Sequence, residues 1–324
     1  MEKLDLRDYK ILSQLDKNAK ASFNQIGRKI KLAPSVVERR IKSLIERKII
    51  IDFKSVINYK RLGWTYYSIY VRFQNINDPK RKEIVNYLIN HPLSGQVLQC
   101  EGRWQLIYGF FAKDIFQLTQ ELRKFNDLFG DYIKEREKII HTGSHHYYRG
   151  YLLNKESVRL DEPYLGGQET TLKIDNKSYN ILNLIRQNSR LNLVVVSEKL
   201  KISVDQIRYR LRKLTEDQIL LGSWLNIDPT KLNLNLYRIL IKLKNFNEKK
   251  EKEFLNFLNK NEHVIRANSI FGTWDYFIDL EINSEGFREF VDEFTRIFSE
   301  QIHEYETLTI YNQVNYAFSP IFPV

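Results

Sequence analysis

The feature that most constrains this chain is an internal repeat with a constant offset of 170 positions. The segment EGRWQLIYGF (101–110) corresponds to FGTWDYFIDL (271–280), with the glycine and the tryptophan in register. RRIKSL (39–44) corresponds in the same way to YRLRKL (209–214), and a small length change enters near residues 115–130. Self-similarity at a fixed offset is typical of a duplicated structural unit. We therefore expect two copies of one fold.

Positive charge is concentrated at the start of each copy. Residues 1–53 hold 13 Lys/Arg against 7 Asp/Glu, and residues 172–224 hold 10 against 5. These two segments account for the whole formal charge of +11, because the rest of the chain sums to zero. Localised positive charge is the electrostatic footprint of nucleic-acid binding, and this pattern predicts double-stranded DNA as a partner.

Composition predicts a globular protein outside the membrane. Hydrophobic residues make up 43% of the chain and charged residues 28%, which is ordinary globular usage. No run of about 18 apolar residues predicts a membrane span, and the opening MEKLDLRDYK has no apolar signal core. The single Cys100 excludes an internal disulfide and agrees with a reducing compartment. We expect a cytoplasmic location.

The first 50 or so residues of each copy are predicted to form three short helices. Asp5 is a candidate N-cap of the first, and Ser22 followed by Gln25 has the spacing of a capping box for the second. Pro34 is favourable at the first position of the third. The third helix is expected to bury Val37, Ile41, Leu44 and Ile45. In the second copy the caps are Asn192 and Ser203, the latter with Gln206, and the β-rich segment IIIDFKSVI (49–57) is suitable for a wing.

The remainder of each copy alternates strands and helices. In the first copy we expect strands over 66–73, 95–100, 105–112 and 133–140 and helices over 79–90 and 115–129. This βαββαβ order is the ferredoxin-like split unit, so the fold class is α+β, with two copies of a winged helix-turn-helix and a ferredoxin-like sandwich domain. The predicted domains are 1–53, 64–154, a charged Gly-Gly linker at 155–171, 172–224 and 234–324.

Three segments carry a resemblance to a known family. They are LDLRDYKILSQLDKNAKASFNQIGRKIKLAPSVVERRIKSLIERKII (4–50), VINYKRLGW (56–64) and GTWDYFIDL (272–280). Together they resemble the leucine-responsive/AsnC-type (Lrp/AsnC) transcription regulators. The resemblance implies a winged helix-turn-helix joined to a sandwich domain that dimerises and often binds a small effector, frequently an amino acid. A tandem copy implies that one chain supplies both halves of the usual homodimer.

A basic helix that reads DNA needs an apolar side for packing and hydrogen-bond donors on the opposite side. At 100° per residue, the third helix of the first copy places Ser35, Arg39 and Lys42 opposite its apolar side, with Val36 flanking and Arg40 at the boundary. Arg40 is placed to reach a phosphate or an acidic neighbour. The full set of predicted DNA contacts is Gln25, Arg28, Lys29, Lys31, Ser35, Val36, Arg39, Arg40 and Lys42 in the first copy, with Gln206, Arg208, Tyr209, Arg210, Arg212 and Lys213 in the second. A solvated basic face is the alternative for the same residues.

The two copies are not equivalent readers of DNA. Tyr209 stands where the first copy has Arg39, so the two helices should prefer different half-sites. Glu198 replaces Arg28 on the supporting helix and should repel the phosphate backbone. Val194 and Val195 replace Asn24 and Gln25, either as local core or as a protein contact.

The glycine-centred hairpins are the candidate effector sites, because the family resemblance places the effector pocket beside them. The residues concerned are Gly102, Trp104, Gly272, Trp274 and Asp275. Asp275 is suited to accept an α-ammonium group, whereas the first copy has Gln105. The alternative is that the glycines only form turns and the tryptophans only fill the core.

Other chemistry is weakly supported by the residues. His141, His145 and His146 are three candidate zinc ligands, but no second ligand cluster accompanies them, and a polar tail after the last strand is the preferred interpretation. No phosphate-binding loop or nucleophile elbow is present. We expect neither a metal nor a cofactor.

Two other functions remain open beside a DNA-binding regulator. Sirohaem decarboxylases also resemble Lrp/AsnC proteins, but typically carry an His-Asn-Tyr-x-Arg-like stretch on the second sandwich strand. This chain has SGQVLQCEG (94–102) and HVIRANSIFG (263–272) there. A protein-interaction scaffold is the third hypothesis. The sequence favours a sequence-preferring regulator that is not an enzyme, with a small effector as a candidate ligand and further homo-oligomerisation through the sandwich domains.

Overall fold

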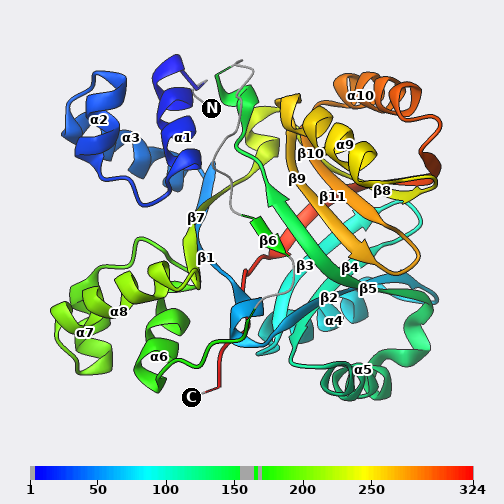
Figure 1. The fold of residues 1–324 in the computed structure, drawn as a ribbon, viewed down its shortest axis with the longest axis horizontal. Helices are drawn as coiled ribbons and strands as arrows, with labels where there is room; N and C mark the ends of the chain where they lie inside the picture. The colour runs from blue at the N-terminus through cyan, green and yellow to red at the C-terminus, as the bar shows by residue number, and fades with distance from the viewer. Residues whose placement is uncertain (1–3, 154–163, 167–169, 324) are drawn as a thin grey trace.

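The computed structural model describes residues 4–153, 164–166 and 170–323 (Figure 1). The first helical unit consists of α1 (Leu6–Lys17), α2 (Phe23–Ile30) and α3 (Pro34–Glu46). The predicted caps are confirmed, since Asp5 accepts hydrogen bonds from the backbone of α1 and Ser22 and Gln25 form a reciprocal capping box. Pro34 occupies the start of α3, as expected.

The second helical unit repeats this arrangement with α6 (Asn176–Ile185), α7 (Leu193–Leu200) and α8 (Val204–Glu216). Asn192 caps α7 and Ser203 caps α8, as predicted. One burial prediction is wrong. Ile45 is 42% exposed, because it lies in the last turn of α3 and is turned away from the side on which Val37, Ile41 and Leu44 are buried.

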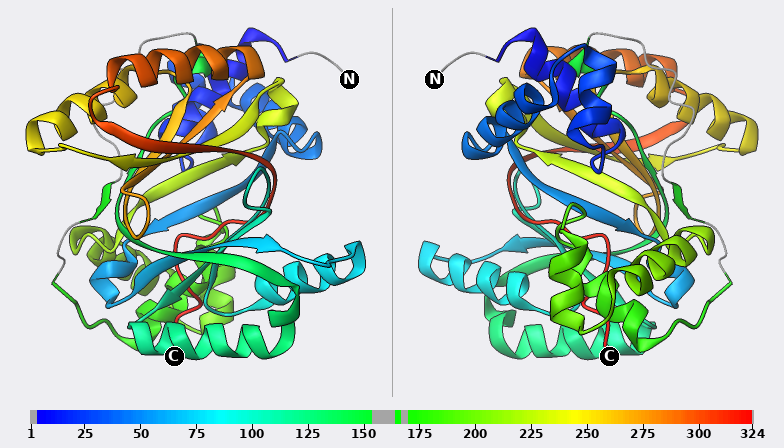
Figure 2. Two further views of the ribbon diagram at one scale, coloured as in Figure 1. Left: turned by 90° about the vertical axis from the view of Figure 1, so that its right-hand side faces the viewer. Right: turned by 90° about the vertical axis from the view of Figure 1, so that its left-hand side faces the viewer.

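Each copy continues into a split βαββαβ unit. The first sandwich unit contains β2 (Thr65–Phe73), α4 (Asp78–Asn90), β3 (Ser94–Glu101), β4 (Leu106–Ala112), α5 (Ile115–Phe129) and β5 (Ile133–His146). The second contains β8 (Asn235–Leu243), α9 (Glu248–Lys260), β9 (Val264–Phe271), β10 (Tyr276–Ile282), α10 (Ser284–Ile297) and β11 (Ile302–Asn315). The helices cover the outside of the two sheets at opposite ends of the molecule (Figure 2). No helix in the described residues is long and apolar enough to cross a membrane.

The two sheets join into a closed ring of antiparallel strands. In the described part of the chain the order is β2-β4-β3-β11-β8-β10-β9-β5, and β5 pairs back with β2. The last strand of each unit makes the junction. The first part of β5 pairs with β2 of its own unit and its end pairs with β9 of the other unit, and β11 pairs in the same way with β8 and then with β3. The expected end of the first of these strands at residue 140 is therefore wrong, because residues 141–146 form ladder bonds with the other copy.

The expected wing is also used differently. Instead of folding back within its own unit, β1 (Ile50–Ile57) pairs antiparallel with β7 (Leu220–Ile227) of the other copy. This ribbon crosses between the helical units, so that each unit packs against residues of the other copy. The first helical unit packs against Leu225 and Ile227 of the second copy, and the second helical unit shares a core with Trp64 of the first. Both helical units consequently lie on one side of the ring (Figure 1). Most of the predicted linker at 155–171 lies outside the described residues, and Tyr164–Gly166 forms the short strand β6 on β5.

Strand alternation divides the side chains between two cores. Ile69 and Ile239 point toward the covering helices, whereas Tyr70 and Leu240, one residue further on, belong to a shared core inside the ring. Because the ring is closed, its inward face is buried as completely as its outward face. Charged side chains at inward positions are therefore forced to find partners inside the protein.

Candidate nucleic-acid interface

The exposed side of α3 carries the predicted DNA contacts of the first copy. Ser35, Arg39 and Lys42 are exposed on it and line one shallow surface depression. Lys42 forms an ion pair with Glu38 at 2.9 Å, one turn earlier on the same helix. Val36 is half-buried beside them, so the side of α3 available to a major groove is polar and cationic.

Arg40 occupies a different position from Arg39. Its guanidinium donates to the Asp5 carboxylate at 2.9 Å and to the Asp8 carboxylate at 2.8 Å. The structure thus places Arg40 with the acidic neighbours at the start of α1, where it fixes α3 against α1. Arg210 repeats this in the second copy by pairing with Asp175 at 3.2 Å. Both arginines are therefore engaged by carboxylates within their own helical units.

The supporting helix α2 adds further cations. Arg28, Lys29 and Lys31 are all exposed at its C-terminal end. Gln25 is exposed as well, and its side chain accepts a hydrogen bond from the Ser22 backbone at 2.8 Å, so its carbonyl oxygen is already used by the helix cap.

The second helical unit presents a more mixed surface. Gln206, Arg208, Tyr209, Arg212 and Lys213 are exposed on α8, and Tyr209 is 56% exposed. Arg208 pairs with Asp205 at 3.1 Å, and the Arg212 guanidinium lies 5.9 Å from the Tyr209 ring centroid. On α7, Val194 is 52% exposed, so this valine is not local core. The α8 surface is therefore cationic with an exposed aromatic ring at the position of Arg39.

The glycine hairpins lie where the two copies meet. A Cβ atom on Gly102 would lie 3.0 Å from the Leu308 side chain, and one on Gly272 would lie 3.1 Å from the Lys138 carbonyl oxygen. Trp104 and Trp274 are buried inside the ring, whereas the exposed Asp275 accepts a hydrogen bond from the Leu243 backbone at 2.7 Å. These residues thus support the contact between copies. The two interior cavities described below are lined by other residues.

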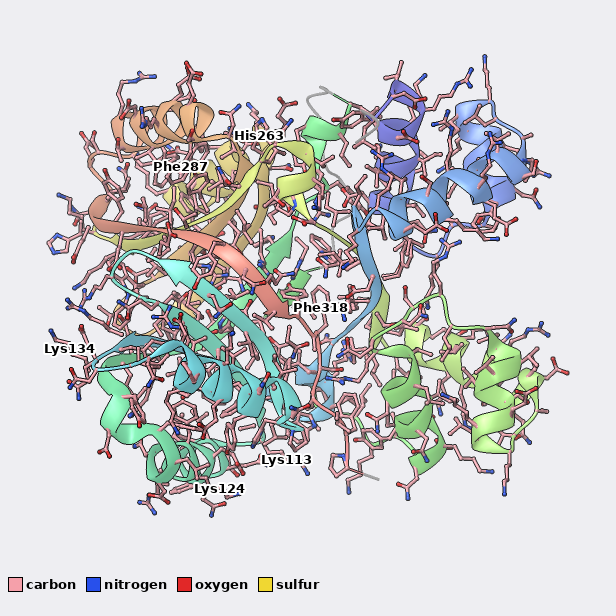
Figure 3. All side chains as sticks on the ribbon, turned by 180° about the vertical axis from the view of Figure 1, so that it is seen from behind. Lys113, Lys124, Lys134, His263, Phe287 and Phe318 are labelled. Carbon is pink, nitrogen blue, oxygen red and sulfur yellow. The ribbon has the colours of Figure 1, made fainter. Side chains whose placement is uncertain are left out.

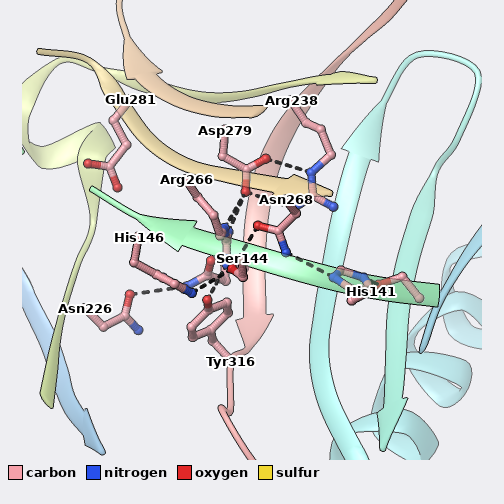
Figure 4. A network of polar contacts seen from close by, with 12 residues as sticks. His141, Ser144, His146, Asn226, Arg238, Arg266, Asn268, Asp279, Glu281 and Tyr316 are labelled. Carbon is pink, nitrogen blue, oxygen red and sulfur yellow. Dashed lines mark hydrogen bonds and ion pairs between the residues drawn. The ribbon is translucent and has the colours of Figure 1, made fainter. Parts of the chain in front are cut away.

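A buried polar cluster inside the ring was not predicted from the sequence (Figure 4). Asp279 accepts hydrogen bonds from Arg238 at 2.7 and 2.9 Å and from Arg266 at 2.9 Å. Although burial opposes ionisation, the two arginines lower the pKa of Asp279, so this carboxyl stays charged. We call these three residues the arginine–aspartate cluster.

A second buried group connects the ring to the first helical unit. Arg149, in the segment after β5, donates to Asp16 of α1 at 2.6 Å and to Glu281 of β10 at 2.7 Å. Its guanidinium also lies 5.0 Å from the centroid of the Trp224 ring on β7. Against the desolvation that burial imposes, Glu281 and Asp16 hold the pKa of Arg149 well above its ordinary value. Arg149 therefore joins three separate parts of the molecule.

The three histidines do not gather around a metal. His141 contacts Ser68 and Asn268 at 2.7 and 3.1 Å, and His146 contacts Ser144 at 2.9 Å. Burial and the positive charge of Arg266 lower the pKa of both His141 and His146 well below the usual value, and Arg238 adds to the lowering at His141, so both rings are neutral. No metal-binding cluster is found among the described residues. The prediction of a tail is wrong for these histidines, because all three lie on β5.

A sequence signal for the cluster did exist. Arg238 and Asp279 lie in the middle of the largely apolar segments LYRILIKL (236–243) and YFIDLEI (276–282), each of which holds only one further charge, and the first copy has Ser68 and Gly109 in their places. A strand with one solvated face tolerates such charges. Only the closure of the ring makes them buried.

Comparisons with known proteins place both helical units in one family. The winged helix-turn-helix DNA-binding profile matches residues 4–51 and 174–220. The HTH-type transcriptional regulator Ptr1 of Methanocaldococcus jannaschii is 34% identical over 119 residues, covering 37% of this chain and 79% of the relative. The HTH-type transcriptional regulator FL11 of Pyrococcus furiosus is 28% identical over 127 residues, covering 39% of this chain and 80% of the relative. Each of these regulators is thus matched over about four fifths of its own length and covers less than half of this chain.

Among solved structures, a similarity extends over the whole chain. The siroheme decarboxylase NirDL superposes with a TM-score of 0.61 over 96% of this chain and 92% of its own, at 12% sequence identity. At this identity the similarity establishes the fold of the duplicated chain and no activity. The repeated family match, the helical units and the paired sandwich units lead to one assignment: the chain belongs to the Lrp/AsnC family of helix-turn-helix transcriptional regulators, with two copies of the family unit in tandem.

Proposed function

We propose that this protein is a sequence-preferring DNA-binding regulator that presents two non-equivalent recognition helices on one intramolecular pseudo-dimer. The observation that carries the proposal is the exposed cationic side of α3, where Arg39 projects opposite the buried residues Val37 and Ile41. An arginine in this position can donate two hydrogen bonds to a guanine edge in the major groove.

The proposed phosphate contacts surround this helix. Arg28, Lys29 and Lys31 supply positive charge from α2, next to the recognition side of α3. In the second unit Arg208, Arg212 and Lys213 supply it from α8. The ribbon of β1 and β7 ties the two units to one side of the ring (Figure 1), so one duplex is the partner that both units can address.

Replacing Arg39 with alanine tests the proposal. A duplex site is first selected from a random pool, and its affinity is measured by fluorescence anisotropy at low salt. The loss of one bidentate base contact costs about 1–3 kcal/mol, so we expect Arg39→Ala to bind the selected site roughly 5- to 150-fold more weakly.

Lys134→Ala is the matched control, since it removes one exposed positive charge on the side of the molecule away from the helical units (Figure 3). The control should retain nearly full affinity. Absence of duplex binding at low salt, or equal losses in the two variants, would contradict the proposal.

We further propose that the chain acts by binding and not by catalysis. Its curated relatives are named as regulators, and the segments 94–102 and 263–272 lack the His-Asn-Tyr-x-Arg-like stretch of sirohaem decarboxylases. The larger of the two interior cavities described here measures about 260 Å³, below the range of about 300–1,000 Å³ that holds drug-sized ligands. A tetrapyrrole is larger still.

Sirohaem itself provides the test of this point. When sirohaem is mixed with the purified protein, we expect its Soret band to remain that of free sirohaem. Mass spectrometry should show that its acetate side chains are intact. A tight complex with an altered Soret band, followed by decarboxylated product, would favour the enzyme.

Three further properties belong to the same proposal. A cytoplasmic location follows from a DNA partner in a reducing compartment. Homo-oligomers would form through the outer surfaces of the sandwich units, where Phe116 and Leu128 of α5 are 77% and 57% exposed. An amino-acid effector would approach the hairpins at Gly102 and Gly272, with Asp275 as its ammonium partner.

A further inference from the structure

The arginine–aspartate cluster has more positive than negative charge. Arg238 and Asp279 are completely buried and Arg266 is 7% exposed, yet two guanidinium groups share one carboxylate. Burial raises the pKa of Tyr316, which is therefore neutral, and the nearby His141 and His146 are neutral too. The neighbouring buried group has the opposite excess, since Asp16 and Glu281 share the single guanidinium of Arg149. Neither of these carboxylates is among the hydrogen-bond partners of Arg266.

One of the two arginines lines a cavity. The central cavity, of about 260 Å³, lies between β7 on one side and β8, β9 and β11 on the other. Arg266 and Tyr316 form its inner end, and Trp224, Ile265 and Ile310 are among its apolar walls. Arg266 also lines a second, smaller cavity.

Arg266 has hydrogen-bonding capacity beyond its described partners. Its Nε and Nη2 atoms donate to Asp279, and its Nη1 atom donates to the Tyr316 hydroxyl. A guanidinium group has five N–H donors, so two remain. Arg238, in contrast, is fixed by Asp279 and by the Tyr70 hydroxyl and lines neither cavity.

The first copy has none of these charges. Ser68, Gln96 and Gly109 occupy the positions of Arg238, Arg266 and Asp279. The Tyr66 side chain fills the corresponding space, since a Cβ on Gly109 would lie only 1.9 Å from its hydroxyl oxygen. The cluster is therefore specific to the second copy.

From this geometry we propose that the central cavity binds one small organic carboxylate per chain, with Arg266 and Tyr316 as its direct partners. The carboxylate accepts hydrogen bonds from the guanidinium N–H groups of Arg266 that Asp279 and Tyr316 leave unused, and the apolar walls accommodate a short hydrocarbon or aromatic body. Glu281 at the far wall already accepts from Arg149 and Tyr151, so this buried carboxylate is not free to take an ammonium group. The proposed ligands are thus simple, oxo or hydroxy monocarboxylic acids and not α-amino acids. The site is distinct from the glycine hairpins.

Isothermal titration calorimetry on the full chain tests this without DNA. The probes are 4-methyl-2-oxopentanoate, phenylpyruvate and benzoate at millimolar concentration, with benzamide as the uncharged match to benzoate and inorganic phosphate as a different anion. We expect at least one carboxylate to bind with a stoichiometry of one per chain and benzamide to give no heat. Binding of phosphate alone, or of no probe, overturns the proposal.

Two variants locate the binding. Arg266→Gln introduces the residue of the first copy and leaves Arg238 and Asp279 as a balanced pair, so the protein should fold and bind the carboxylate at least 10-fold more weakly, as expected for a lost charge-assisted hydrogen bond. Ile51→Trp narrows the mouth of the cavity from a position that is 49% exposed, leaves the cluster intact and should also weaken binding. Unchanged affinity in a folded Arg266→Gln protein, or in Ile51→Trp if the first variant does not fold, overturns the assignment.

Discussion

Replacing Arg149 with methionine should lower the free energy of unfolding by about 3–5 kcal/mol, the usual cost of removing one partner from a buried ion pair. The side chains of Arg149, Asp16 and Glu281 are 2–4% exposed, so the two carboxylates left behind would have no solvent to compensate them. Methionine retains much of the packing of the arginine stem, which limits the free-energy cost of any cavity left by the substitution. Urea denaturation followed by circular dichroism gives the measurement.

Arg103→Met is the matched control for this effect. Arg103 also pairs with carboxylates, those of Glu135 and Glu306, but its side chain is 44% exposed, and pairs of this kind contribute about 0–1 kcal/mol. A triple variant, Arg149→Met with Asp16→Asn and Glu281→Gln, should recover part of the lost stability because the orphaned charges are gone. Equal losses for Arg149→Met and Arg103→Met would show that the buried group does not join the units as described.

DNA binding should fall steeply as salt rises. If about six phosphates are neutralised across both helical units, log K should fall with log[salt] at a slope near −5, and affinity should drop by about 10³-fold between 50 and 200 mM salt. Anisotropy titrations of one duplex over a salt series measure this slope.

Single lysine variants then separate the contributions of the two units. Lys29→Ala, on α2, should reduce the slope by about 1, the contribution of one phosphate contact. Lys199→Ala occupies the equivalent position on α7 and should do the same if the second unit lies on the duplex. A shallow slope in the parent protein, or one that Lys29→Ala leaves unchanged, would contradict phosphate binding by these helices.

Local features of the fold were accessible from the sequence because local contacts determine them. Asp5, Ser22 and Ser203 cap the helices they were expected to cap, since each cap involves only the next two or three residues. The helix at Ile115–Phe129 has the predicted ends for the same reason. Contacts between copies were not accessible in this way. The extension of β5 over residues 141–146 depends on a partner strand at least 120 residues away, and β1 becomes a ribbon strand only because β7 lies opposite.

The candidate DNA contacts were predicted by helical geometry, which orients Arg39 outward whatever surrounds α3. Arg40 required knowledge of α1, because its partners Asp5 and Asp8 are more than 30 residues earlier. The arginine–aspartate cluster required still more. In an isolated sandwich unit, alternation would place Arg238 and Asp279 on a face that water could reach, and only the second sheet closes over it.

The covalent connection between the two halves of the ring changes how this protein responds to dilution. In an obligate homodimer the folded state depends on the concentration of protomers, so a scarce regulator loses its paired form as its copy number falls. Here β3 pairs with β11 and β5 with β9 inside one chain, and the paired form is present even in a single molecule. The same connection means that a substitution in one half is not repeated in the other, which allows Arg39 and Tyr209, or Gln96 and Arg266, to diverge independently.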